Sequence, residues 1–287
     1  MIVKKLKLNS PDYPEVLRNI VDPPEQLYHT GAPLEELLRQ PSVAIVGTRR
    51  VSPYGKQVTM QLARELAEQG IVVISGLALG VDCLAHKAAL DAGGQAIAVL
   101  PSPLEAIAPA TNRHLAQEIL DKGGALVSEY ASGTHPVKQY FIARNRIVSG
   151  LADALLITEA AEKSGSLHTA NFALDQGKTV MAVPGNVTSE GAVGVNNLVK
   201  TGATPVTSYA DVMHVLGLKP KQQATRAIKG RNDNEQTILD LLIRGIMDGH
   251  ELLDKSRLTA SQFAQVLTML ELGGKIRSLG GNKWGIY

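Results

Sequence analysis

Three short segments of the sequence combine small, hydroxyl and basic residues in the way that anion-binding loops do. They are Gly47-Thr48-Arg49-Arg50, Ser75-Gly76-Leu77-Ala78-Leu79-Gly80, and Ser164-Gly165-Ser166 with Thr169 one helical turn later. Free backbone N–H groups at a helix N-terminus bind phosphate oxygens, and glycine and hydroxyl residues favour such contacts. Each loop alone also fits a plain turn, tight packing or serine capping. Three such loops at one sheet edge favour a shared anion groove.

Residues 131–150 form a basic, aromatic segment without a single acidic residue. The segment contains Lys138, Arg144 and Arg146, and it also contains the adjacent aromatic residues Tyr140 and Phe141. The whole chain has a net charge of only +2 and 4% aromatic residues, so this clustering is unusual. Cations that follow phosphates and rings that stack on bases are typical of proteins that bind single-stranded nucleic acid. The alternative is that Phe141 belongs to the core and that the arginines are merely solvated.

Motifs for cofactors, metals and covalent catalysis are missing from the sequence. There is no G-x-G-x-x-G loop, no G-x-S-x-G elbow and no H-E-x-x-H pair among the seven histidines. Asp82 and His86 have the spacing of a metal pair but lack a third ligand, so a structural pair is expected. Cys83 lies in an apolar helical stretch. Glu159, at a strand end beside the Ser164 loop, is the one carboxylate placed to catalyse, and we expect no cofactor and no metal.

Short apolar runs alternate with amphipathic stretches from Ser42 onward. The predicted strands are Val43–Val46, Ile71–Ser75, Ala96–Leu100, Ala125–Ser128, Ala154–Thr158 and Thr179–Val183. The predicted helices between them include Tyr54–Gln69, Val81–Ala92, Asn112–Asp121 and Leu167–Gln176. Continuous apolar strands separated by helices indicate a parallel sheet buried on both faces. The fold class is therefore α/β with a doubly wound parallel sheet, in which ligands bind at the carboxyl edge of the strands.

The C-terminal part of the chain has a different pattern. Residues 217–232 read as a basic linker with Lys219, Lys221, Arg226, Lys229 and Arg231. Residues 233–287 predict three helices and a hairpin, which is the pattern of a small winged-helix domain. They carry seven acids against six bases, so this domain is expected to contact protein or to help DNA binding only weakly.

The length and composition of the chain limit the number of domains and indicate the cellular compartment. A chain of 287 residues predicts about two domains. We expect a segment at 1–40 packed on a domain at 41–216, then the linker and the domain at 233–287. The single cysteine rules out an internal disulfide and fits a reducing compartment. The sequence shows no signal peptide and no apolar run that could cross a membrane, so a soluble, cytoplasmic protein is expected.

Five ordered motifs between about Tyr13 and Gly217 resemble the DNA-processing protein A family, DprA, also called Smf. The motifs are Val46-Gly47-Thr48-Arg49, Ser75-Gly76-Leu77-Ala78-x-Gly80-x-Asp82, His135-Pro136-x-x-x-x-Phe141-x-x-Arg144-Asn145-Arg146-Ile147, Glu159-Ala160-x-x-x-Ser164-Gly165-Ser166-x-x-Thr169-Ala170 and Ala182-Val183-Pro184-Gly185. The tail is similar to the winged-helix domain that many members carry. The chain departs from the family pattern after the third strand, where Pro101–Glu105 replaces a glycine-rich turn, and at Ile142 and His168.

This resemblance implies an extended Rossmann domain that binds single-stranded DNA, protects it, and loads the recombinase RecA onto it during natural transformation. It also implies a homodimer formed through the Rossmann domain, and no enzymatic activity. The DNA-binding residues that it implies are Gly47, Thr48, Arg49, Ser75, Gly76, Lys138, Phe141, Arg144, Asn145, Arg146, Ser164, Gly165, Ser166 and Thr169. The alternative is a nucleotide hydrolase of the lysine-decarboxylase-like group that uses Glu159, although the Ser164 loop lacks that group's second pair of glycines.

Overall fold

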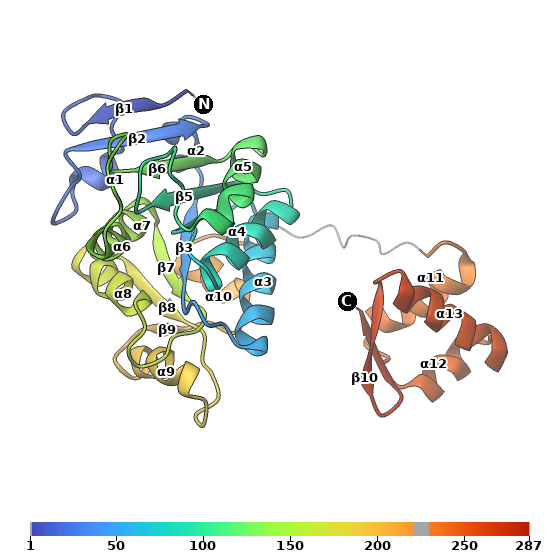
Figure 1. The fold of residues 1–287 in the computed structure, drawn as a ribbon. Helices are drawn as coiled ribbons and strands as arrows, with labels where there is room; N and C mark the ends of the chain where they lie inside the picture. Colours follow the sequence, from blue (N-terminus) through green and yellow to red (C-terminus); the bar gives the residue numbers. More distant parts are fainter. Residues whose placement is uncertain (1, 221–229, 287) are drawn as a thin grey trace. The chain divides into compact units, whose positions relative to one another are not determined.

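The computed structural model describes residues 2–220 and 230–286 and forms two compact units, 1–220 and 221–287. Figure 1 shows an α/β unit followed by a smaller unit of helices and a hairpin. The predicted linker at 217–232 falls partly outside the described residues, since Lys221, Arg226 and Lys229 are not described.

A nine-stranded sheet forms the centre of the first unit, with the order β1-β2-β6-β5-β4-β3-β7-β8-β9. The seven strands from β6 to β9 in this order are parallel, β2 pairs antiparallel with β6, and β1 pairs antiparallel with β2. The strands are β1 Lys4–Lys7, β2 Gln26–Gly31, β3 Ser42–Val46, β4 Val72–Ser75, β5 Ala96–Leu100, β6 Ala125–Ser128, β7 Ala154–Ile157, β8 Thr179–Ala182 and β9 Thr204–Pro205.

Helices cover both faces of this sheet, which confirms the predicted doubly wound α/β fold. In Figure 1, α3, α4, α5 and α10 lie on one face, while α1, α7 and α8 lie on the other. The helices are α1 Glu15–Arg18, α2 Leu34–Leu38, α3 Pro53–Glu68, α4 Val81–Asp91, α5 Arg113–Asp121, α6 Lys138–Ala143, α7 Asn145–Leu151, α8 Ser166–Asp175, α9 Val193–Lys200 and α10 Tyr209–Val215, with short 3₁₀ turns at Ala110–Asn112 and Glu190–Ala192.

The central strand β3 shows why the sheet strands are apolar throughout. Val43 and Ile45 pack into the core on one face of the sheet, and Ala44 and Val46 pack into the core on the other. Because helices cover both faces, positions 43–46 are all apolar, and the one polar residue, Ser42 at the start of the strand, bonds its hydroxyl to Asp153. The sheet therefore ends abruptly at Gly47, where the first polar loop begins.

The N-terminal segment contains two strands that the sequence does not predict. The short helices α1 and α2 lie in this segment, and the strands β1 and β2 extend the sheet beyond β6. The alternation in β1 is hidden because only Leu6 is buried among three exposed lysines. Leu6, Leu17 and Leu27 join the same buried cluster as the central strands, so this segment shares the core of the first unit.

The second unit has the predicted order of three helices and a hairpin. Phe263, Val266, Leu267 and Leu270 form the buried face of one helix, whose N-cap Thr259 makes the expected capping box with Gln262. Gly281 and Asn282 both have positive φ in the two-residue turn of the hairpin. The elements are α11 Asp233–Ile243, α12 Gly249–Ser256, α13 Ala260–Leu272, β10 Ile276–Gly280 and β11 Lys283–Ile286.

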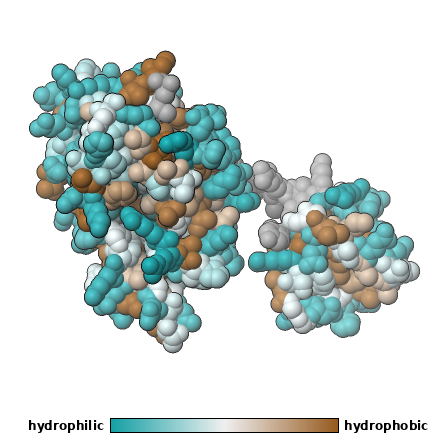
Figure 2. All heavy atoms as spheres, viewed as in Figure 1, coloured by the Kyte–Doolittle hydropathy of each residue, from teal (hydrophilic) through white to brown (hydrophobic). Residues whose placement is uncertain are grey.

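Most of the visible surface is hydrophilic, with single hydrophobic residues scattered over it (Figure 2). Such isolated exposed apolar residues are ordinary on protein surfaces. Of the described helices, none combines the length and apolar character that crossing a bilayer requires.

Candidate nucleic-acid interface

An open cavity of about 340 Å³ lies at the carboxyl edge of the sheet, which we call the Arg49 cavity. It forms where the loops after β3, β4 and β7 meet the junction of α6 and α7. Its lining residues are Val46, Gly47, Thr48, Arg49, Arg50, Ala78, Asp82, Phe141, Ile142, Arg144, Asn145, Ser164, Gly165, Ser166 and Thr169. A doubly wound sheet binds its ligands at this edge, so the fold and the cavity agree.

Ten of the fourteen predicted binding residues line this cavity together. The structure thus brings the first loop, the Ser164 loop and the basic, aromatic segment to one place. Ser75, Gly76, Lys138 and Arg146 do not line it. Arg50, which also lines the cavity, was left out of the predicted set, and its position beside Arg49 was the signal that pointed to it.

The loop after β3 presents two cations on a closely packed backbone. A Cβ atom on Gly47 would lie 2.6 Å from the Val81 side chain and 2.7 Å from the Glu159 carbonyl oxygen, so only glycine fits there. The next residue, Thr48, donates its backbone N–H to the same carbonyl oxygen at 2.8 Å. Arg49 and Arg50 follow directly and are both exposed. The packing of the loop therefore holds two exposed arginines at the cavity.

The Ser164 loop supplies hydroxyl groups and a helix N-terminus. The Oγ atoms of Ser164 and Ser166 lie 2.8 Å apart, and Ser166 is the first residue of α8. Thr169, one turn into the helix, is buried and also lines the cavity. The N–H groups of Leu167 and His168 donate to the carbonyl oxygens of Ser164 and Gly165 at 3.1 and 3.3 Å, so the hydroxyl groups and the positive end of the helix dipole are what favour a bound anion here.

Phe141 lies at the wall of the cavity. The ring is partly exposed, and Phe141 belongs to none of the core clusters that the described residues form. The Arg49 guanidinium lies 5.5 Å from the centre of the ring, within the range of a cation–π contact. The neighbouring Tyr140 stacks on Tyr130 with ring centres 4.0 Å apart. A cation and a ring thus stand side by side, as binding of a phosphate and its base requires.

Arg144 lines the cavity with its charge held inside the protein. The side chain is buried, and its guanidinium donates hydrogen bonds to the carbonyl oxygens of Gly76 and Val99. Burial lowers the pKa of Arg144 to about 10, and the nearby Asp82 carboxylate opposes that shift. Arg144 stays charged at neutral pH, so it contributes a fixed positive charge behind the cavity rather than a mobile arm.

The absence of a side chain at Gly76 leaves the space that the Arg144 guanidinium occupies. A Cβ atom on Gly76 would lie 2.3 Å from one guanidinium nitrogen of Arg144. Asp82 accepts the backbone N–H groups of Gly76 and Ala78 at 3.1 and 3.4 Å, which orders the loop after β4. Burial raises the pKa of Asp82, and Arg144 and these N–H groups oppose the rise. The partners of Asp82 are thus the loop and Arg144 rather than His86.

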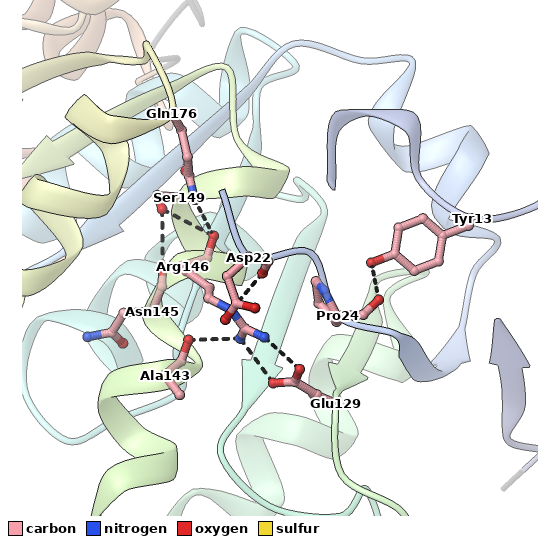
Figure 3. A network of polar contacts seen from close by, with 9 residues as sticks. All are labelled: Tyr13, Asp22, Pro24, Glu129, Ala143, Asn145, Arg146, Ser149 and Gln176. Carbon is pink, nitrogen blue, oxygen red and sulfur yellow. Dashed lines mark hydrogen bonds and ion pairs between the residues drawn. The ribbon is translucent and has the colours of Figure 1, made fainter. Parts of the chain in front are cut away.

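Arg146 lies at the centre of a polar network away from the cavity (Figure 3). Its guanidinium pairs with Glu129 at 2.6 Å and with Asp22 at 2.8 Å, and it also donates to the Ala143 carbonyl oxygen. Burial lowers the pKa of Arg146, but the two acids outweigh that effect and raise it. In this structure two carboxylates already accept the hydrogen bonds that the sequence assigned to a phosphate.

The remaining predicted residues also have defined places. The hydroxyl of Ser75 is buried and donates to the Ile45 carbonyl oxygen at 2.6 Å. Lys138 is exposed at the first position of α6, three residues before Phe141. Glu159 lines a different cavity from that of the Ser164 loop. Within residues 2–220 and 230–286 no three acidic, histidine or cysteine side chains gather as metal ligands.

The fold and this site define a Rossmann-like α/β protein with a basic, hydroxyl-rich cavity at the carboxyl edge of its sheet. The chain belongs to the DNA recombination-mediator protein A family, the DprA/Smf family, whose family model matches residues 4–217. A second model, of the DprA winged helix domain, matches residues 222–282. The family is one of DNA-processing proteins, and the resemblance seen in the sequence is confirmed.

Relatives with curated names share the first unit. The DNA processing protein DprA of Bacillus subtilis is 38% identical over 214 residues, which covers 75% of this chain and 71% of that protein. The protein Smf of Escherichia coli is 41% identical over 204 residues, which covers 71% of this chain and 54% of that protein. The matching region thus spans only about half of the length of the E. coli relative.

Solved structures agree with the fold. DprA from Streptococcus pneumoniae superimposes with a TM-score of 0.69 at 37% identity, over 74% of this chain and 73% of that one. DNA processing protein A from Helicobacter pylori superimposes with a TM-score of 0.66 at 38% identity, over 75% of this chain and 95% of that one. The Helicobacter structure was described for a unique single-stranded DNA binding mode of that protein.

Proposed function

We propose that this protein binds single-stranded DNA without sequence preference through the Arg49 cavity. The observation that carries the proposal is the placement of two exposed arginines, the Phe141 ring and the N-terminus of α8 around one cavity. Phosphates of the strand contact the cations and the helix N-terminus, while a base stacks on the ring. The Helicobacter relative, which is 38% identical, binds single-stranded DNA and supports the proposal.

The biological role follows from the family. We propose that the protein protects incoming single strands and loads RecA onto them during natural transformation, as the family resemblance implies. It does so as a homodimer in the cytoplasm, with an interface in the first unit away from the carboxyl edge. Light scattering at micromolar concentration tests the dimer, and a monomer there would refute it.

The proposed role is binding rather than catalysis. The hydrolase alternative uses Glu159 as its carboxylate, but Glu159 lines a different cavity from the serine loop. Asp82 does line the Arg49 cavity, but its carboxylate accepts the backbone N–H groups of Gly76 and Ala78. Incubation with nucleoside monophosphates tests this directly. We expect no free base, and release of base would favour the hydrolase.

An electrophoretic shift assay with oligonucleotides of no particular sequence tests the main proposal. The single strand should shift at much lower protein concentration than the same sequence as a duplex, because only unpaired bases can stack on Phe141. Equal affinity for both forms would contradict the proposal. Loss of the shift in high salt is expected for either form and decides nothing by itself.

A further inference from the structure

A second cavity, of about 370 Å³, opens two residues along the chain from the Arg49 cavity. Arg50 lines the first cavity and Ser52 lines the second, so the two share one loop. We call it the Glu159 cavity. Tyr54, Pro184 and Val195 contribute apolar wall, and Glu159 is its only charged lining residue.

The Glu159 carboxylate is buried without a cation. The residue is only 5% exposed, and its Oε2 atom accepts the backbone N–H of Ser52 at 3.0 Å. Among the described residues no lysine, arginine or histidine forms an ion pair with it, and no donor contacts its Oε1 atom. A buried carboxylate is costly unless hydrogen bonds or a cation compensate it. One oxygen of this group is therefore open to a ligand.

Two glycines make room for this carboxylate. A Cβ atom on Gly55 would lie 1.9 Å from Oε2, and one on Gly191 would lie 2.8 Å from Oε1. Ser52 is the N-cap of α3, and a negative charge at the N-terminus of that helix is favourable. Capping accounts for Oε2, but it leaves Oε1 unused beside the cavity.

The lining defines the chemistry of the ligand. Apolar walls suit a flat ring, and a carboxylate with open acceptor sites suits a ring edge that carries N–H donors. Guanine presents a ring N–H and an amino group side by side on one edge. One of these donors can bond to the open Oε1, and the other can bond to the remaining lone pair of Oε2, which already accepts the Ser52 N–H. Thymine presents one N–H between two carbonyl oxygens, which the carboxylate repels.

We propose that the Glu159 cavity binds a guanine base of the same DNA strand whose phosphates contact the Arg49 cavity. The proposal rests on the proposed function, because the shared loop at Arg50–Ser52 places the base next to the bound backbone. It adds a preference for guanine at one nucleotide to binding that is otherwise independent of sequence.

Three oligonucleotides test the proposal on the unmodified protein. They are a thymidine homopolymer and two copies in which one central thymine is replaced by guanine or by hypoxanthine, which lacks the amino group. Because every other base is thymine, the strand can align on the protein in any position. In the register that places the substituted base in the cavity, we expect guanine to bind about tenfold more tightly than hypoxanthine, the effect of one hydrogen bond to a charged group. Hypoxanthine keeps the ring N–H, so it should bind between guanine and thymine. Equal affinity for all three overturns the guanine assignment and leaves the proposed function intact. Failure of all three to bind contradicts both.

A pair of variants tests whether Glu159 is responsible. Glu159→Gln keeps the size of the side chain and an oxygen for the Ser52 N–H, but it should abolish the preference for guanine. Glu190→Gln is the control, since it removes one exposed negative charge next to Gly191 and should keep the preference. A guanine preference that survives in a folded Glu159→Gln protein, as shown by its thermal melt, overturns the assignment. If that variant does not fold, the three oligonucleotides on the unmodified protein still decide.

Discussion

In the proposed complex, the neighbouring side chains of Arg49 and Phe141 have different roles, since Arg49 contacts a phosphate and Phe141 stacks on a base. The guanidinium lies 5.5 Å from the ring centre, so charge and stacking surface occupy one spot. The contributions of the two side chains to the free energy of DNA binding depend differently on salt. Counterions compete with Arg49 for phosphate, but they do not compete with a ring for a base.

We expect Arg49→Ala to lower the slope of log K against log salt by about 0.7, the value for one phosphate contact on a single strand. The loss of DNA affinity caused by Arg49→Ala should become smaller as the salt concentration rises. Arg49→Lys should restore part of the affinity, because lysine lacks the planar pair of donors. Lys138→Ala should act like Arg49→Ala if this exposed residue of α6 reaches the strand. Unchanged binding by both alanine variants would remove the proposed groove.

Phe141→Ala should weaken binding by about 1–3 kcal/mol and leave the salt slope nearly unchanged. Affinity at several salt concentrations measures both quantities. Thermal melts of the same samples are the control, since Phe141 lies outside the core clusters formed by the described residues and its loss should cost little stability. A melting temperature far below that of the parent would assign Phe141 to the core.

The burial of His86 predicts how the free energy of unfolding depends on pH. It is fully buried on α4, and burial lowers its pKa from 6.5 to about 3. Between these pH values the unfolded chain binds a proton that the folded chain does not, so stability falls as pH falls. The loss is about 1.4 kcal/mol for each pH unit below 6.5.

Denaturant unfolding of the parent and of His86→Leu over this pH range isolates the effect. Both proteins lose stability from their carboxyl groups, but the variant should lose less, by the amount that His86 contributes. Parallel pH profiles for the two proteins would show that His86 is not the group responsible.

At the scale of elements, α6 and α7 supply one wall of the Arg49 cavity and are held in place by buried arginines. Arg144 ties their junction to the loop after β4 and to β5, through the carbonyl oxygens of Gly76 and Val99. Arg146 ties α7 to the end of β6 through Glu129 and to the N-terminal segment through Asp22. The position of Phe141 thus depends on elements distant in sequence.

We expect Arg146→Ala to lower the stability of the first unit by about 2 kcal/mol, less than for a fully buried pair because Asp22 is largely exposed. Arg146→Lys should retain only part of the stability that Arg146→Ala loses, since lysine cannot bind Glu129 with two parallel hydrogen bonds. Thermal melts measure the loss. The salt slope for DNA should stay unchanged, and a slope reduced by about 0.7 with normal stability would instead make Arg146 a phosphate contact.

At the scale of the whole molecule, the two units differ in what they offer to DNA. The first unit holds the Arg49 cavity. The second, from Asp233 on, has seven acids and six bases, and the exposed face of α13 carries Ser261, Gln265 and Thr268 without a cation. A winged-helix domain that binds double-stranded DNA normally carries basic residues on this helix.

We therefore expect a chain that ends at Pro220 to keep most of its affinity for single strands. The cut belongs after Pro220 rather than after Leu216, because Leu218 packs on the core and its N–H donates to the Met213 carbonyl oxygen. Shift assays compare the truncated and full chains, and melts confirm folding. Loss of most of the affinity would assign binding to the second unit or to the basic residues at 221–231.

Six of the seven parallel strands, the helices α3, α4, α5 and α8, and the loops at the carboxyl edge were predictable from the sequence. The two-residue strand β9 was not predicted. Strands buried on both faces are continuously apolar, and the glycine and hydroxyl loops after them must meet at one edge. The strands β1 and β2 were not predictable, because β1 buries one leucine among lysines and pairing with β6 makes β2 a strand.

Only the tertiary structure decided what each charged residue does. Arg49, Arg144 and Arg146 look alike in the sequence as cations in basic stretches without nearby acids. In the fold Arg49 is exposed at the cavity, Arg144 is buried behind it, and Arg146 pairs with Glu129 and Asp22. Asp22 lies 124 residues away from Arg146 along the chain, so no local pattern reveals the pair. Residue type determined that this protein carries a basic site, whereas long-range packing determined which of its charges are free to bind.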